Sequence, residues 1–176
     1  PSEDASQAES VPDISAEDVS EDIKTEKDYP VLCGSFMQPG AFKGHSLSRM
    51  KEHLGYMLDV GIDILILQWS FVTEGDKVSS VFYESSFGAD KKAASYDESG
   101  KMLLDTILAA AEEMGVKVFI GLNENPEWWN KYVTDKNWLT QQSELGIEGA
   151  KQMYDTYKSK YPNAFHGWYF VFEFSN

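Results

Sequence analysis

Apolar positions follow two alternating patterns between residues 31 and 176. The first is a continuous apolar run, which predicts buried β-strands at residues 31–37, 64–69, 116–122 and 167–174. The second is apolar residues at helical spacing, which predicts amphipathic helices over residues 46–59, 104–114 and 147–161. Uniformly apolar strands that alternate with helices are typical of a parallel sheet with its strands in chain order.

Glycines mark the junctions of this repeat. Gly61 and Gly115 each follow a predicted helix, and a buried strand begins a few residues later. The connections after the strands are longer and more polar than those before them. Short αβ and long βα connections favour a barrel or wound sheet whose function lies at the carboxyl ends of its strands. Because a complete barrel needs about 250 residues, we expect an α/β fold that is the N-terminal half of a (β/α)8 TIM-type barrel.

Two polar stretches interrupt the pattern. Residues 1–28 contain ten acidic residues and two lysines, with only isolated apolar positions. Such a composition cannot bury enough apolar surface to fold, so residues 1–30 are predicted to be a disordered acidic leader. Residues 31–176 are predicted to be the barrel domain, apparently incomplete. Residues 73–98 are predicted to be a polar insertion with a short β pair near residues 78–83.

Charge and hydropathy exclude some classes of function. The formal net charge is −14, from 29 acidic and 15 basic residues, which disfavours binding to nucleic acid or to an anionic membrane. No apolar run approaches the roughly 20 residues that span a bilayer, so we expect no membrane insertion by this chain. The chain is rich in aromatics, with five Trp, nine Tyr and ten Phe. Aromatic rings fill cores, but they also stack on sugars.

Polar and aromatic side chains gather where the predicted strands end. Amides and carboxylates hydrogen-bond sugar hydroxyls, and indoles cover apolar sugar faces. Glycosidic cleavage needs one carboxylic acid and a second carboxylate. Glu173 is the candidate acid, and Glu124 or Glu127 is a candidate second group. The predicted substrate-binding residues are Gln38, Gln68, Trp69, Asn123, Glu124, Trp128, Trp129 and Asn176.

Each of these residues also has a structural interpretation. Glu173 could be an ion-pair partner, Gln68 could bind loop backbone, and the tryptophans could pack against the next helix. Alternation along the last strand places Trp168, Phe170, Phe172 and Phe174 on one face, which we expect to lie under helices. The opposite face, with Gly167, Tyr169, Val171 and Glu173, should then point to the barrel axis or cleft.

Other chemistries have little support in the sequence. His45, His53 and His166 lack metal-ligand spacing, and there is no phosphate-binding glycine loop or nucleophile elbow. We therefore expect no metal and no cofactor.

The chain resembles a bacterial family of domains of unknown function, family 4434. Four stretches carry the resemblance, at residues 34–38 (GSFMQ), 61–69 (GIDILILQW), 115–122 (GVKVFIGL) and 167–173 (GWYFVFE). The resemblance implies a TIM barrel related to glycoside hydrolases, a carbohydrate ligand and export from a bacterial cell, as a secreted, periplasmic or surface-anchored protein. It also implies that Glu173 is the strand-4 acid/base. The sequence departs from many retaining barrel glycosidases, because Phe172 stands where they carry Asn, and the strand that supplies their second carboxylate is missing.

The predicted function is therefore glycoside hydrolysis with Glu173 as general acid/base, by this chain or by a larger protein of which it is a fragment. Whether the chain is an enzyme stays open at this point. One alternative is a non-catalytic carbohydrate-binding barrel. Another is a structural half-barrel that functions only when assembled, since open sheet edges invite self-association or pairing with a missing C-terminal half.

Overall fold

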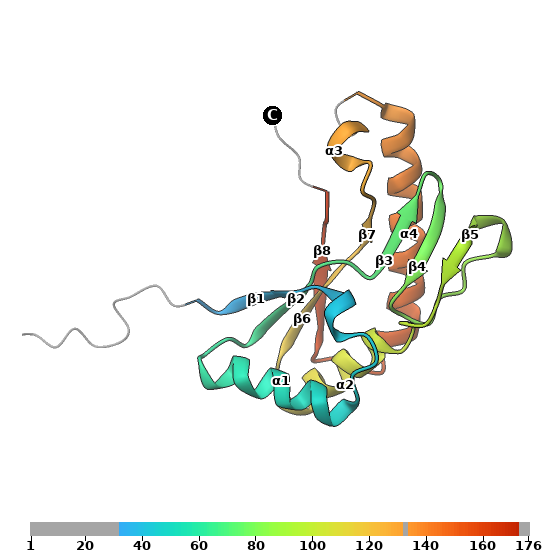
Figure 1. Ribbon diagram of the computed structural model, residues 1–176. Coiled ribbons are helices and arrows are strands. Elements are labelled where there is room, and N and C mark those ends of the chain that lie inside the picture. The colour runs from blue at the N-terminus through green and yellow to red at the C-terminus, as the bar shows by residue number, and fades with distance from the viewer. Residues whose placement is uncertain (1–31, 132–133, 173–176) are drawn as a thin grey trace, which may run out of the picture. The chain divides into compact units, whose positions relative to one another are not determined.

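A four-stranded parallel sheet organises the fold. The computed structural model describes residues 32–131 and 134–172. The sheet has the order β1-β2-β6-β8, with bounds β1 (Gly34–Met37), β2 (Ile64–Leu67), β6 (Lys117–Gly121) and β8 (Phe165–Tyr169). Neighbouring strands are parallel throughout. The predicted α/β class, with a parallel sheet in chain order, is confirmed (Figure 1).

Two helices, α1 (Leu47–Asp59) and α2 (Leu103–Met114), pack against each other beside this sheet (Figure 1). They begin and end where the sequence provides signals. The hydroxyl of Ser46 accepts a hydrogen bond from the Arg49 amide at 3.2 Å, and Gly115 ends α2 with φ +76°. Hydrophobic residues of both helices and the sheet form the main core, including Leu54, Leu65, Ile107 and Val118.

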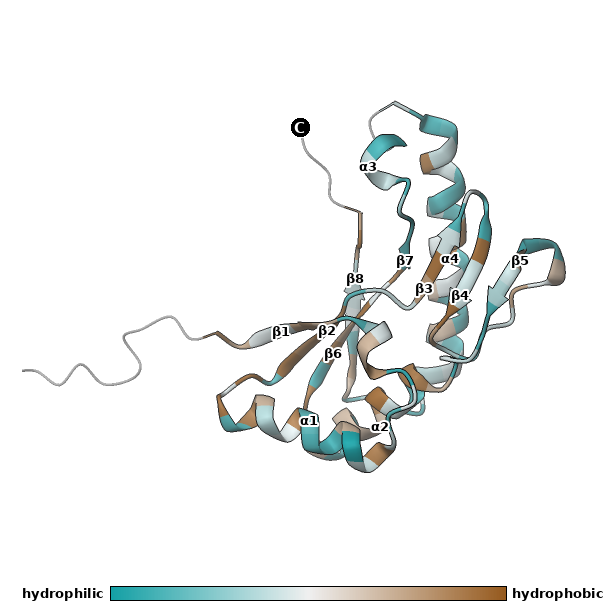
Figure 2. Ribbon diagram, viewed as in Figure 1, coloured by the Kyte–Doolittle hydropathy of each residue, from teal (hydrophilic) through white to brown (hydrophobic). Residues whose placement is uncertain are grey.

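A second sheet takes the place of the expected polar insertion. Its order is β5-β4-β3-β7, with bounds β3 (Phe71–Glu74), β4 (Lys77–Val81), β5 (Lys92–Asp97) and β7 (Asn123–Glu124). Strands β3 and β4 form an antiparallel hairpin, and β7 pairs with β3 in parallel. The sequence predicted only a short β pair here, because the strands are short and mix polar with apolar residues (Figure 2).

The long helix α4 (Lys136–Tyr157) packs near the second sheet. It begins earlier than predicted, at a cap in which the Asp135 carboxylate accepts from the Trp138 amide at 2.9 Å. Gly149 lets the helix approach closely, because a Cβ there would lie 2.5 Å from the Phe71 ring. The short helices are α3 (Trp128–Lys131), η2 (Pro39–Phe42) and η3 (Ala89–Lys91).

The expectation that one aromatic face of the last strand lies under helices is wrong for two residues. Trp168 is 37% exposed and Phe170 is 48% exposed, whereas Phe172 is buried. Strand β8 is an edge strand, and no helix follows it within the described residues to cover that face. The predicted acidic leader, residues 1–30, lies outside the described residues.

Candidate functional site

A pocket of about 200 Å³ lies where β2, β7 and β8 end. Three segments contribute to it: the turn after β2, the stretch from β7 into α3, and the end of β8 with the residues beyond it. Its lining residues are Gln68, Trp69, Glu124, Asn125, Trp128, Trp129, Tyr169, Val171 and Phe172. The carboxyl ends of parallel strands therefore meet at a concave site, as in many α/β proteins.

Close backbone packing holds the turn that carries Gln68 and Trp69. The Gln68 amide donates to the Met37 carbonyl at 2.9 Å, which ties the turn to β1. On the other side, a Cβ on Gly121 would lie only 2.3 Å from the Gln68 carbonyl oxygen. Glycine at position 121 is thus a requirement for β6 to pass so near to this turn.

The same turn presents two polar atoms without partners. The Gln68 side-chain oxygen and the Trp69 indole nitrogen are buried and form no hydrogen bond with any described residue. Leaving a buried donor or acceptor unsatisfied costs about 1–3 kcal/mol. Both residues line the pocket, so a polar ligand entering it could supply the missing partners.

Glu124 adds a carboxyl group to the lining of the pocket. It is half-buried, and burial raises the pKa of its carboxyl above the usual range. None of the described residues that line the pocket is Lys, Arg or His. A carboxyl with a raised pKa in a cleft is typical of acid/base sites.

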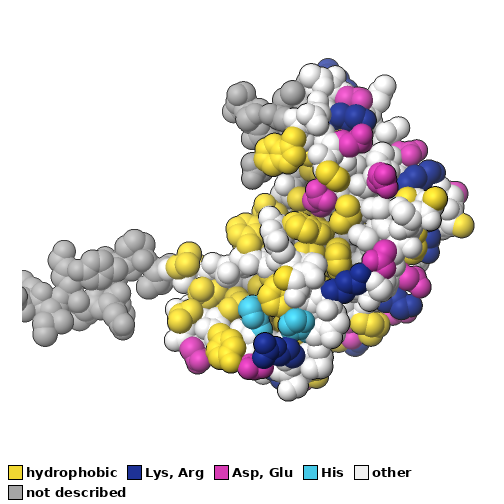
Figure 3. All heavy atoms as spheres, in the orientation of Figure 1, with side chains coloured by type: hydrophobic (Ala, Val, Ile, Leu, Met, Phe, Trp, Pro, Cys, Tyr) yellow, Lys and Arg dark blue, Asp and Glu magenta, His cyan; other side chains and the backbone are white. Residues whose placement is uncertain are grey.

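The adjacent tryptophans of α3 have different surroundings. Trp128 is 5% exposed and stacks on Phe172, with ring centroids 4.8 Å apart. Trp129 is 73% exposed, at the side of the molecule where Figure 3 shows hydrophobic side chains open to solvent near α3. Trp128 is therefore a buried part of the pocket lining, whereas the indole of Trp129 is exposed to solvent beside it.

Of the predicted substrate-binding residues that the structure describes, two are not among the lining residues. Asn123 is buried, and its side-chain amide donates to the Gln142 carbonyl at 3.1 Å and to the Gln142 side-chain oxygen at 3.2 Å. Gln38 lies at the same edge of the sheet, after β1, but it is exposed and outside the pocket.

Glu127, the other candidate for the second carboxylate, has structural partners. Its carboxylate accepts from the Trp138 indole nitrogen at 3.2 Å and forms an ion pair with Lys131 at 3.2 Å. These contacts join α3 to the start of α4. Of the two candidates, only Glu124 lines the pocket.

The predicted catalytic residue, Glu173, and the predicted ligand residue Asn176 lie outside the described residues. Glu173 directly follows the lining residue Phe172 in sequence.

Several lining residues were not proposed from the sequence: Asn125, Tyr169, Val171 and Phe172. Alternation along the last strand did place Tyr169 and Val171 on the face that points to the axis, so a signal was present for those two. No such signal in the sequence pointed to Asn125, which is the same residue type as Asn123 and lies two residues further along the same loop.

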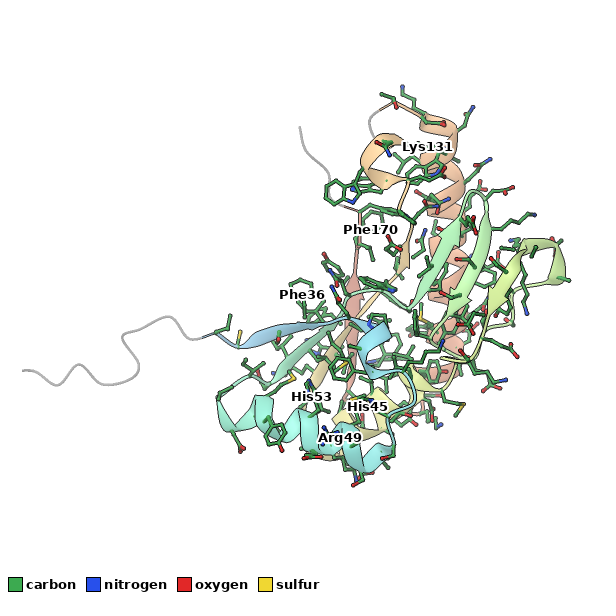
Figure 4. The ribbon with its side chains drawn as sticks, in the orientation of Figure 1. Phe36, His45, Arg49, His53, Lys131 and Phe170 are labelled. Carbon is green, nitrogen blue, oxygen red and sulfur yellow. The ribbon has the colours of Figure 1, made fainter. Side chains whose placement is uncertain are left out.

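The histidines lie apart from this pocket. His45 and His53 flank the Phe42 ring, with centroids 5.3 and 4.6 Å away (Figure 4). Burial is the main cause that lowers the pKa of His53. Among the described residues, no group of three or more His, Cys, Asp or Glu side chains is placed to hold a metal ion. Likewise, none of the described helices has the length and apolar character needed to cross a membrane.

These features define an α/β protein with a pocket of aromatic, amide and carboxyl side chains at the carboxyl edge of a parallel sheet. The chain belongs to the family described as a domain of unknown function, DUF4434, whose model matches residues 32–176. This match confirms the resemblance seen in the sequence.

The fold is similar to that of a solved structure from Bacteroides thetaiotaomicron VPI-5482, which is described as a "putative alpha-L-fucosidase". The TM-score is 0.62 at 21% identity, and the match covers 91% of this chain and 47% of that one. This chain thus spans about half the length of the fucosidase-like structure, and at this identity the likeness shows the fold alone. A comparison with curated proteins finds no match.

Proposed function

We propose that the chain is a glycoside-hydrolase-like protein that binds carbohydrate in the pocket at the carboxyl edge of its parallel sheet. The observation that carries the proposal is the composition of this pocket. Buried polar atoms without partners among the described residues, a half-buried carboxyl and an exposed indole meet in one concavity. This combination suits a ligand with hydroxyl groups on its edge and an apolar face.

The sheet supports the finer proposal of half a (β/α)8 barrel. Four parallel strands follow one another in chain order, with α1 and α2 as crossover helices between the first three. The similar structure from Bacteroides thetaiotaomicron is about twice as long as the matched region. Four further β/α units would complete such a barrel, and the pocket would then open at its catalytic end.

For the reaction, we propose that Glu173 is the general acid/base. Protonation of the leaving oxygen by a carboxylic acid is the step that glycosidases of both stereochemical classes share. Glu173 directly follows Phe172 in the sequence, and Phe172 lines the pocket. Glu124 is the carboxyl that the described residues place in the pocket itself.

The test combines hydrolysis and binding on the whole chain. Release of nitrophenol from aryl glycosides is measured alongside glycan binding, for the wild type and for Glu173→Gln. Loss of hydrolysis with retained binding supports the enzyme. Binding without hydrolysis by the wild type instead supports the alternative, a non-catalytic carbohydrate-binding protein. Absence of any glycan binding rejects both.

One observation favours a role for assembly. Strands β1 and β8 are the edges of the sheet, and each is paired on one side only within the described residues. Exposed edges pair readily with other chains, so we propose that the half-barrel associates with a second copy or with a matching half. Light scattering on the purified chain tests this, and a monomer at high concentration contradicts self-association.

A further inference from the structure

The polar residues that line the pocket bear on the charge of the ligand that it can bind. We propose that the pocket accepts neutral, hydroxyl-bearing sugar residues and disfavours residues that carry a carboxylate or a sulfate. This inference rests on the proposed carbohydrate-binding function and specifies its substrate class.

The first argument concerns the two unpartnered atoms of the turn after β2. The Gln68 side-chain oxygen can only accept a hydrogen bond, and the Trp69 indole nitrogen can only donate one. Hydroxyl groups both donate and accept, so a neutral sugar can satisfy both atoms. A carboxylate has no hydrogen to donate. It could accept from Trp69, but it would leave the Gln68 oxygen facing a negative charge.

The second argument concerns the charge already present. The Glu124 carboxyl is half-buried, and burial alone is the cause that raises its pKa. The described residues that line the pocket include no cation to offset the cost of its ionised form. A second anion bound beside Glu124 would add repulsion in a region of lowered dielectric.

The third argument concerns the available cations. A cation gives a sugar carboxylate its strongest hydrogen-bonding partner, and Arg is well suited to this by its bidentate geometry. None of the described lining residues is basic. Lys131 of α3, which Figure 4 labels, is engaged in an ion pair with Glu127 at 3.2 Å. The described part of the pocket therefore offers no cationic partner for a sugar carboxylate.

The experiment compares sugars that differ in charge at one position. Three sets of methyl glycosides are used, based on glucose, galactose and mannose, each as the neutral sugar, its 6-carboxylate and the methyl ester of that acid. Binding to the whole chain is measured by calorimetry or ligand-observed NMR at pH 7. In whichever set binds, we expect the carboxylate to bind at least tenfold more weakly than the neutral sugar, and the ester to recover most of the loss.

Two variants tie the effect to the pocket. Glu124→Gln should recover part of the affinity for the carboxylate. Glu84→Gln, at an exposed glutamate after β4, should not. Equal or tighter binding of the carboxylate by the wild type overturns the inference but leaves the proposed function standing. If no member of any set binds, and no other glycan binds, both the proposed function and this inference are rejected.

Discussion

The rings of Phe36 and Tyr169 meet edge to face, with centroids 5.3 Å apart, although they belong to β1 and β8, the opposite edges of the parallel sheet. Neighbouring strands lie about 4.8 Å apart, so three spacings in a flat sheet would separate these strands by about 14 Å. Contact between the two rings therefore requires a strongly curled sheet with both side chains on its concave face. This curvature is what a half-barrel needs.

If the contact helps to hold the curl, the two rings should be energetically coupled. We expect a double-mutant cycle of Phe36→Ala and Tyr169→Ala to give a coupling of about 0.5–1.5 kcal/mol in urea unfolding. The control pairs Phe36→Ala with Tyr56→Ala, at an exposed residue of α1, and these effects should add. Additivity in both cycles would mean that the ring contact contributes nothing to the fold.

A second prediction concerns two helical glycines. A Cβ at Gly149 of α4 would lie 2.5 Å from the buried Phe71 ring, whereas a Cβ at Gly55 of α1 would meet only the end of Met114, at 3.9 Å. Gly149→Ala should therefore lower the free energy of unfolding by about 1–3 kcal/mol through overpacking. Gly55→Ala should raise it by about 0.5–1 kcal/mol, because alanine favours the helix. Changes of the same sign in chemical denaturation would contradict the packing described here.

A third prediction concerns the amides between α4 and β3. The Gln142 side chain is fully buried. It accepts from the Thr73 hydroxyl at 2.6 Å and from Asn123, and it donates to the Gly75 carbonyl at 2.6 Å. Gln142→Met keeps the volume but leaves several buried groups unpaired, each costing about 1–3 kcal/mol.

We therefore expect Gln142→Met to be strongly destabilising in thermal or urea unfolding. Its neighbour Gln141 is exposed, so Gln141→Met should change stability by less than about 0.5 kcal/mol. Similar stabilities for the two variants would show that this network is dispensable.

The network around Gln142 is an example of a feature that could not be predicted from the sequence, whereas the parallel sheet could be. Apolar runs and the glycines at 61 and 115 were sufficient for the parallel sheet, because burial and helix termination are local in origin. The role of Asn123 was not predictable, since it depends on β7 pairing with β3 and presenting the amide to Gln142 on α4. Such contacts join segments distant in sequence. Trp69 and Glu124, in contrast, could be placed at strand ends from the pattern, and both line the pocket. That they bind a substrate stays a prediction.

A fourth prediction follows from the raised pKa of Glu124. Where the pH lies between the carboxyl pKa of the unfolded chain and the higher pKa of the folded chain, the folded state holds a proton that the unfolded state has lost. Stability therefore falls as the pH rises through this window. Glu124→Gln removes the effect.

The variant and the wild type should be about equally stable near pH 3.5, and the variant should become the more stable of the two toward pH 7. Unfolding midpoints measured across this range test the prediction. Glu84→Gln, at an exposed position, serves as the control and should follow the wild type. A wild type that gains stability relative to Glu124→Gln as the pH rises would reverse the sign and show that the carboxylate has a favourable partner.

The last prediction separates the adjacent tryptophans of α3. Trp128 is 5% exposed and packs with Trp138 and Phe172, so Trp128→Ala should lower the free energy of unfolding by about 3–5 kcal/mol. Trp129 is 73% exposed and lines the pocket, so Trp129→Ala should leave stability nearly unchanged. If its indole stacks on sugar, as we propose, glycan affinity should fall at least tenfold in Trp129→Ala and much less in Trp129→Phe, which keeps an aromatic face. Unchanged glycan affinity in the well-folded Trp129→Ala variant would show that Trp129 does not stack on sugar. The proposed site would then lack an aromatic platform, because Trp128 is buried and cannot replace it.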